Sequence, residues 1–149
     1  GIGATMFTRF LGISGFSNLI SSVVSDTGLS VMMILLIIVC IYLILGTFME
    51  PFGAMLVTLP IFLPLIEAQG LSLVWFGVLV VKLLEVGMIT PPVGMNVFVI
   101  KNVASRYVTV TDVFRGVFPF ILADLVVVLL ILALPGLVLF LPEMMAQPR

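Results

Sequence analysis

The feature that most constrains this chain is a run of about 23 residues without a charged side chain, at positions 27–49. At a rise of about 1.5 Å per residue, a helix of this length can cross a hydrocarbon core about 30 Å thick. The rest of the chain has the same character, since 62% of its residues are hydrophobic, 9% are charged and the mean hydropathy is +1.43. A soluble domain is about half apolar and about a quarter charged. We therefore expect an all-α polytopic membrane protein that lies in a lipid bilayer.

The charge, cysteine and histidine contents exclude several classes of function. The formal net charge of −1 and the pI near 5.1 provide no basic surface for nucleic acid. The single cysteine, Cys40, cannot form a disulfide within the chain or a four-thiolate metal site. Histidine is absent, which removes the usual general base, zinc ligand and haem ligand. The sequence therefore predicts no bound cofactor and no nucleic-acid partner.

The first residues do not resemble a signal peptide, because Gly1-Ile2-Gly3 brings no initiator methionine, no basic region and no cleavage site. We expect the chain to be part of a longer protein. Residues 1–28 predict the end of a preceding helix and then an interfacial amphipathic helix. The apolar residues that recur at helical spacing in this second segment are Phe16, Leu19, Ile20, Val23 and Val24.

Glu50 lies between two apolar arms with no polar linker, because the segment GTFMEPFG at residues 46–53 leads directly into a second apolar stretch. The two arms are either two full spans or a re-entrant hairpin whose tip stops inside the membrane. The second arm has about 14 residues, fewer than the roughly 20 of a span. It also contains Pro60 and Pro64, which lack a backbone donor. Length therefore favours a re-entrant helical hairpin over residues 29–69.

A helix interrupted at membrane depth is predicted over residues 70–105. Its apolar first half carries Lys82 and Glu85 on one face, close enough to pair. The segment GMITPPVG then places two prolines and two glycines in an otherwise apolar run. We expect the first half to end near Gly87 and the second to begin around Pro92, because proline suits the first helical position.

Three of the six basic residues, Lys101, Arg106 and Arg115, lie close together in the sequence. Cytoplasmic loops carry an excess of Lys and Arg, so we expect a cytoplasmic loop at residues 106–116. Residues 117–149 would then form a last transmembrane helix and a periplasmic tail. The open end of the hairpin would face the periplasm as well.

The hairpin tip and the interrupted helix together predict one cavity, because non-helical backbone at membrane depth needs protein or water to satisfy it. The half-helix that ends near Gly87 would leave carbonyl groups with partial negative charge, suited to a sodium ion. The half-helix that begins near Pro92 would offer N–H groups suited to a carboxylate. Thr47, Thr90 and Asn96 would supply neutral oxygens of the kind that a hard cation accepts, and Thr47 and Thr90 are the expected sodium ligands. The candidate ion- and substrate-binding residues are Gly46, Thr47, Glu50, Gly87, Thr90, Pro91, Pro92, Gly94 and Asn96.

Each of these features also has a structural interpretation. Glycine and proline are common at kinks in membrane helices. Glu50 is either an ion or proton ligand or a cap that accepts bonds from backbone amides. Lys82 and Glu85 are either a structural pair that holds a helix in place or part of the binding site. Asp124 either lies near the cytoplasmic interface or packs on another helix.

Several motifs follow one another along the chain. They are Gly46-x-Phe48-x-Glu50, Pro60-Ile61-x-x-Pro64, Gly70, the run GMITPPVGMNVFV from Gly87, Phe114-Arg115-Gly116-x-x-Pro119-Phe120 and Leu141-Pro142. Taken in this order, they resemble the C-terminal end of the large, DctM-like subunit of tripartite ATP-independent periplasmic (TRAP) transporters. The resemblance covers nearly the whole chain, and the TPPVG segment after the hairpin is its most specific part.

The resemblance implies a sodium-coupled elevator mechanism in the ion-transporter fold with inverted repeats, of which this chain would hold the second. It also implies a small, DctQ-like membrane subunit and a periplasmic solute-binding protein that delivers a carboxylate, such as a C4-dicarboxylate or a sugar acid. The protein would be a multi-pass protein of the bacterial inner membrane, with Na⁺ as its coupling ion. The tip residues Gly46, Thr47 and Glu50 and the turn at residues 87–96 would match the ion site of the second repeat.

Two other classes of function are alternatives to transport. A non-transporting membrane anchor or assembly subunit needs long apolar runs, but it has no need of successive breaks at membrane depth. An intramembrane enzyme is not expected, because the sequence has no histidine, no paired aspartates on facing helices and no Gly-x-Ser-x-Gly elbow.

Overall fold

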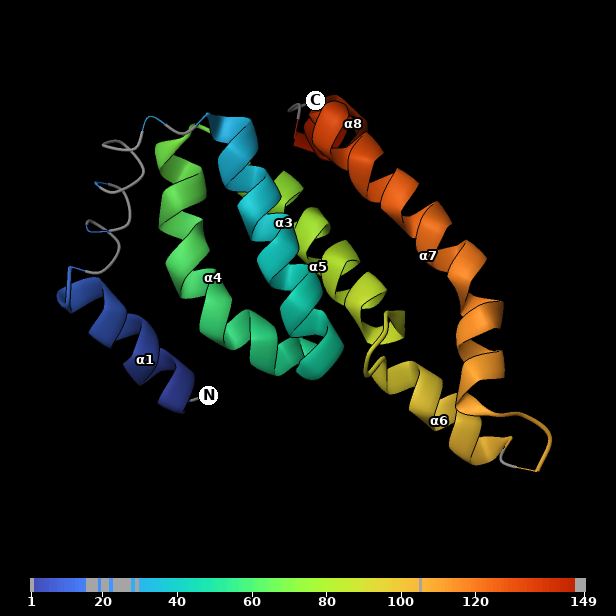
Figure 1. Cartoon of the computed structure of the whole chain (residues 1–149). Coiled ribbons are helices and arrows are strands. Elements are labelled where there is room, and N and C mark those ends of the chain that lie inside the picture. The colour runs from blue at the N-terminus through green and yellow to red at the C-terminus, as the bar shows by residue number, and fades with distance from the viewer. Residues whose placement is uncertain are drawn as a thin grey trace.

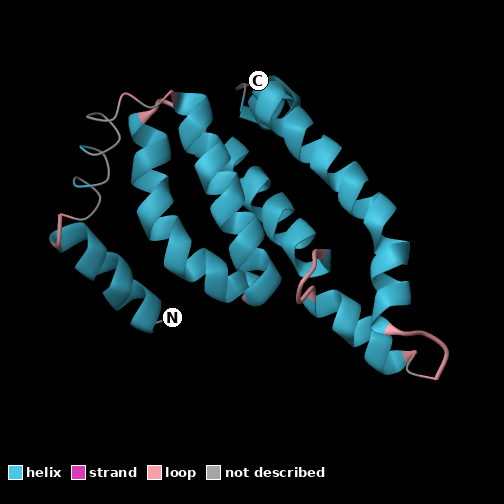
Figure 2. Ribbon diagram, in the orientation of Figure 1, coloured by secondary structure: helices cyan, strands magenta, loops and turns pink. Residues whose placement is uncertain are grey.

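The computed structural model describes residues 2–15, 19, 22, 28, 30–104 and 106–146, and its regular elements in these ranges are all helices (Figures 1 and 2). The expectation of an all-α chain is therefore confirmed for the described residues. Of the five apolar residues that predict the interfacial amphipathic helix, Phe16, Ile20, Val23 and Val24 lie outside the described residues. The helices are α1 (Ile2–Ile13), α3 (Val31–Phe48), α4 (Pro51–Ala68), α5 (Leu73–Ile89), α6 (Met95–Val103), α7 (Val110–Ala133) and α8 (Pro135–Ala146).

Helices α3 and α4 form a hairpin with a very short connection at Met49 and Glu50. Ser30 caps the start of α3 by accepting a bond from the Met33 amide, and Glu50 caps α4. Each arm is 18 residues long, so the sequence-based estimate of about 14 residues for the second arm is too short. Proline at the first position pre-organises α4 to begin directly after the cap. Length therefore does not favour a re-entrant hairpin over two spans.

A hydrogen bond joins the two arms of the hairpin in the half nearer its tip. The hydroxyl groups of Tyr42 and Thr58 lie 2.7 Å apart in the buried space between α3 and α4. Thr58 donates its only hydroxyl proton to the Ala54 carbonyl at 2.7 Å, so Tyr42 donates to Thr58. This bond fixes one arm against the other without leaving a buried polar atom unpaired.

Helix α5 is the centre of the described core. It packs mainly against α3 on one side and against α7 on another, as Figure 1 shows. Phe76, Leu79 and Leu83 are fully buried along it. Trp75 is buried as well, and its indole N–H donates to the Ile131 carbonyl of α7 at 2.8 Å. The central helix is thus held to α7 by a directed bond in addition to apolar packing.

The chain leaves the helical conformation within the TPPVG segment. Helix α5 ends at Ile89, and α6 begins at Met95 rather than around Pro92. Residues 91–93 form a turn that includes a cis Pro91–Pro92 peptide bond. Gly94 then adopts φ +57°, a left-handed conformation that favours glycine, and α6 starts directly after it. The second half-helix is therefore shorter than the sequence indicated.

The C-terminal part differs from its predicted bounds at both ends. Helix α7 begins at Val110, inside the predicted loop, because Thr109 and Asp112 form a reciprocal capping box. Arg115 therefore lies in a helix and not in a loop. The last apolar stretch is also not one helix, because α7 ends at Ala133 and α8 begins at Pro135. Proline has no amide proton with which to continue α7.

Three helices in the described ranges, α3, α4 and α7, are long and apolar enough to cross a membrane. Their outer surfaces carry large apolar side chains that are well exposed, among them Ile44, Phe52 and Phe118. Such a surface suits contact with lipid. The chain is therefore a multi-pass membrane protein.

Candidate ion and substrate site

The hairpin tip and the interrupted helix meet at two glycines. Gly46 lies near the end of α3 and Gly87 near the end of α5, and both are buried. A Cβ atom on Gly87 would lie 2.5 Å from Cα of Gly46, and a Cβ atom on Gly46 would lie 3.0 Å from Cα of Gly87. No side chain fits between the two backbones at this crossing. The tip and the break of the helix therefore lie directly against each other.

Two threonines follow these glycines, one at the tip and one at the break. Thr47 donates its hydroxyl proton to the Ile44 carbonyl at 2.7 Å, and Thr90 donates to the Val86 carbonyl at 2.6 Å. A hydroxyl oxygen that donates its proton still has lone pairs to offer. The hydroxyl oxygens of both predicted sodium ligands can therefore still bind a cation.

Glu50 is a helix cap. One oxygen of its carboxylate accepts from the Phe52 amide and the other from the Gly53 amide, each at 3.0 Å. These bonds satisfy amides that the first turn of α4 cannot pair within the helix, and the negative charge suits the positive end of the helix. Two roles were considered for Glu50, an ion or proton ligand and a helix cap. Its contacts within the chain are those of a helix cap.

The turn beyond α5 leaves the beginning of α6 without a side-chain cap. Gly94 is the N-cap residue of α6 and has no side chain to accept from the first amides. It is buried against Phe114 of α7, since a Cβ there would lie 3.2 Å from the Phe114 ring and 3.2 Å from the Thr90 carbonyl oxygen. The first N–H groups of such a helix start can bind an anion.

Three predicted site residues are not packed into this arrangement. Pro91, Pro92 and Asn96 are all exposed, on the outer side of the turn and the first turn of α6. The structure thus brings Gly46, Gly87 and the two threonines to one region, and it leaves the prolines and Asn96 on the outside.

A hollow of about 360 Å³ lies beside the tip. It is bounded by the start of α4 and by one face of α5, where Pro51, Leu84 and Met88 line it. Glu85 also borders it, so this carboxylate lies beside the tip region. In the described part of the chain, no three His, Cys, Asp or Glu side chains are grouped to hold a metal ion.

Lys82 is at the centre of a charge cluster with Glu85 and Asp124. The contact with Asp124 was not predicted from the sequence. The ammonium nitrogen of Lys82 lies 3.0 Å from a Glu85 oxygen, the expected pair, and 2.6 Å from an oxygen of Asp124. Asp124 therefore packs on another helix, which is one of the two roles considered for it, and it links α7 to α5. The signal for this pairing was the presence of opposite charges in two apolar segments, but the sequence could not show that the segments are neighbours.

The sequence was compared with protein families and with curated proteins. The family model described as "Tripartite ATP-independent periplasmic transporter, DctM component" matches residues 2–137. The chain is 34% identical over 140 residues, or 94% of its length, to the C4-dicarboxylate TRAP transporter large permease protein DctM of Pseudomonas aeruginosa. That match covers 32% of the relative.

Two further relatives carry other substrate names. The isethionate TRAP transporter permease protein DctMQ of Oleidesulfovibrio alaskensis is 34% identical over 92% of this chain and 21% of the relative. The sialic acid TRAP transporter large permease protein SiaM of Vibrio cholerae is 35% identical over 76% of this chain and 26% of the relative. The chain spans about a third of the length of the curated DctM relatives that it matches.

Proposed function

Because this chain belongs to the DctM component family of tripartite ATP-independent periplasmic transporters, we propose that it forms part of the large membrane subunit of a sodium-coupled transporter of small organic anions. The family consists of transporter components, so the chain is not an enzyme. The single observation that carries the proposal is the contact between Gly46 at the hairpin tip and Gly87 at the end of α5. A membrane anchor has no need of such a contact beside an interrupted helix.

The proposed ion site uses the tip and the C-terminal end of α5. The carbonyl ends of α5 carry partial negative charge, and Thr47 and Thr90 add neutral oxygens whose protons already point to backbone carbonyls. A hard cation such as Na⁺ prefers oxygens of this kind. Gly46 and Gly87 act by letting the two backbones approach, and Glu50 acts by holding the tip in shape.

The proposed anion site uses the start of α6. Its first amides have no side-chain cap at Gly94, so an oxyanion can take the place of the cap. The relatives are named for a C4-dicarboxylate, a sialic acid and isethionate. Isethionate is a sulfonate, so we extend the expected ligand from a carboxylate to a small organic anion. Pro91, Pro92 and Asn96 lie on the exposed side of this turn, where a ligand or a further segment of the protein can reach them.

The proposed transporter contains more than this chain. We propose a small DctQ-like membrane subunit and a periplasmic binding protein as partners, and the bacterial inner membrane as the location. The close tip contact supports an elevator type of movement, because a hairpin in backbone contact with α5 would be carried across the bilayer together with α5.

Replacing Thr90 by alanine tests the ion site. In the complete transporter reconstituted in liposomes, we expect T90A to lose most sodium-driven uptake and to need a higher sodium concentration, because the change removes a cation-binding oxygen. Uptake is measured against the sodium gradient. Thr111→Ala is the matched control, since Thr111 is exposed in the first turn of α7. Uptake by T90A with an unchanged sodium dependence would contradict the proposal.

A further inference from the structure

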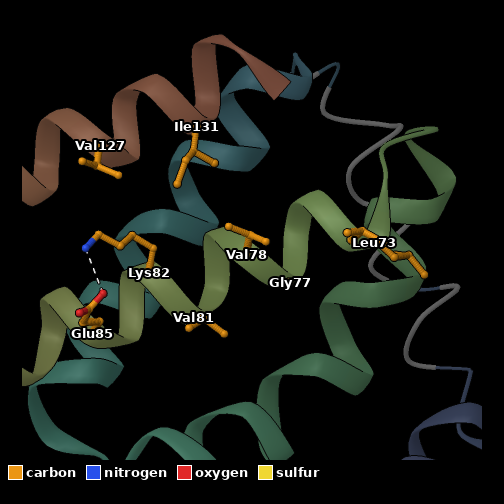
Figure 3. Close-up of a pocket in the computed structure, with 9 residues that line it drawn as sticks. Leu73, Gly77, Val78, Val81, Lys82, Glu85, Val127 and Ile131 are labelled. Atoms are coloured by element: carbon orange, nitrogen blue, oxygen red, sulfur yellow. Dashed lines mark hydrogen bonds and ion pairs between the residues drawn. The ribbon is translucent and has the colours of Figure 1, made fainter. Parts of the chain in front are cut away.

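An apolar groove runs between α5 and α7, and it shares Val81 and Glu85 with the hollow beside the hairpin tip. The groove is open along its length and has a volume of about 570 Å³, and Figure 3 shows Val78 of α5 and Val127 and Ile131 of α7 along it. Lys82 and Glu85 close one end of the groove, so it is apolar along its length and charged at one end. None of the predicted ion- or substrate-binding residues lines it.

The charged end carries one excess negative charge. Lys82 contributes one positive charge, while Glu85 and Asp124 contribute two negative charges. The shorter contact, at 2.6 Å, pairs Lys82 with Asp124, and both of these side chains are about one-fifth exposed, at 20% and 21%. Glu85 shares the same ammonium group at 3.0 Å, and its side chain is 59% exposed. The unbalanced charge is therefore that of Glu85.

A lipid environment cannot neutralise this carboxylate. Ionised groups at membrane depth face protein or water and pair with an opposite charge, because hydrocarbon offers no compensating interaction. Glu85 borders both the groove and the hollow beside the tip, and its nearest exposed neighbours on the same face of α5, Val78 and Val81, are apolar. A partner that complements this surface is therefore mainly apolar and brings one positive charge to Glu85.

The rest of α5 indicates where that partner comes from. Leu79 and Leu83 on its opposite side are fully buried. The exposed residues of the same helix all line the groove, and they are Leu73, Val74, Val78, Val81 and Glu85. Helix α5 is the central helix of the core, but one of its faces is uncovered. Another element is needed to cover this face and complete the core. The DctM relatives are about three times as long as the matched segment, so such a transporter has further helices to supply.

We propose that the α5–α7 groove seats another membrane helix of the same large subunit, and that a lysine or arginine of this helix pairs with Glu85. This inference rests on the proposed function only in that the chain is part of a larger membrane subunit. The short Lys82–Asp124 contact keeps the walls of the groove together, and Glu85 selects the register of the incoming helix. The helix that fills the groove is expected to have an apolar face that carries one basic residue.

Photo-crosslinking from Val78 tests the seat. A photoreactive residue is placed at Val78 in the complete subunit in native membranes, and the products are identified by mass spectrometry. We expect an intramolecular crosslink to an apolar segment that contains Lys or Arg. Val126 of α7 is the matched control, because it is 55% exposed, against 42% for Val78, and does not line the groove. A crosslinked fraction several-fold higher at Val78 supports the proposal.

Other products would overturn it. At Val126 we expect lipid adducts. Lipid adducts alone at Val78 as well would show that the groove faces the bilayer. A crosslink from Val78 to a separate subunit would show that another protein fills the groove. The readout needs no transport, so it stays informative if sodium coupling proves wrong.

A charge-pairing test follows from the crosslink. Glu85→Gln should lower the melting temperature of the complete subunit by leaving the opposing basic group unpaired. Replacing that basic residue by methionine in the E85Q background should recover part of the loss, because neither charge is then left alone. A control at Glu67, which is exposed at the end of α4, should show no such coupling. Additive effects of the two changes would refute the pairing.

Discussion

At the scale of single residues, Gly46 and Gly87 have the most specific role in the described part of the chain. Each is placed where the backbone of another helix occupies the position of a side chain. Other helical glycines, such as Gly116, have open space where a Cβ would stand. Two glycines in the same type of helix therefore have different functions, and only the surroundings distinguish them.

Replacing Gly87 by alanine should separate α3 from α5. The added methyl group would meet backbone atoms of Gly46, and backbone cannot rotate away as a side chain can. We expect a loss of about 1–3 kcal/mol in stability, the usual cost of overpacking, together with a strong loss of uptake. Thermal unfolding of the complete subunit measures the first effect.

The matched control is Gly116→Ala, which should be neutral or stabilising by up to about 1 kcal/mol, because alanine favours a helix. Equal melting temperatures for G87A and G116A would mean that the glycine crossing is not tightly packed.

At the scale of elements, the Lys82–Asp124 pair joins α5 to α7 across a surface that is otherwise apolar. Trp75 makes a second directed contact between the same helices through the Ile131 carbonyl. These two contacts lie at different heights along α5, so they fix the rotation of α7 as well as its distance. Apolar packing alone defines such a rotation poorly.

Lys82→Met should disturb this element pair more than Asp124→Asn. Removing the lysine leaves two carboxylates near each other, whereas removing the aspartate charge leaves Lys82 paired with Glu85. We expect K82M to cost up to about 3 kcal/mol, at the lower end for a broken buried pair because the groups are partly exposed. Thermal unfolding of both variants measures the difference, and a larger effect of D124N would contradict this order.

At the scale of the whole molecule, the helices place two polar ends far apart. Figure 1 shows the open end of the hairpin and the C-terminal helix at one end, and the connection between α6 and α7 at the other. The basic residues Lys101 and Arg106 lie at this second end. The arrangement agrees with a cytoplasmic α6–α7 connection and a periplasmic open end of the hairpin.

Thiol labelling in intact cells tests this orientation. In a Cys40→Ala background, a cysteine at Gln69 should react with a membrane-impermeant reagent added outside the inner membrane. A cysteine at Arg106 should react only after the membrane is permeabilised, because the positive end faces the cytoplasm. Labelling of both positions from the same side would contradict the orientation.

The sequence alone determined the properties that depend on local composition. The membrane environment, the break in the TPPVG segment and the sharp bend at Glu50 could be predicted because hydrophobicity, proline and glycine act within a few residues. The bounds of α4, α6 and α7 differ by a few residues from those predicted from the sequence. The reason is that the helix ends depend on the caps at Glu50 and Thr109 and on the turn at Gly94.

Only the tertiary structure decided which distant residues meet. The contact of Gly46 with Gly87 and the pairing of Lys82 with Asp124 join helices that lie well apart in the sequence. Hydrophobic periodicity shows that a helix face is apolar, but many partners satisfy an apolar face equally well. The choice among them depends on shape and charge complementarity across the fold, which no single segment contains.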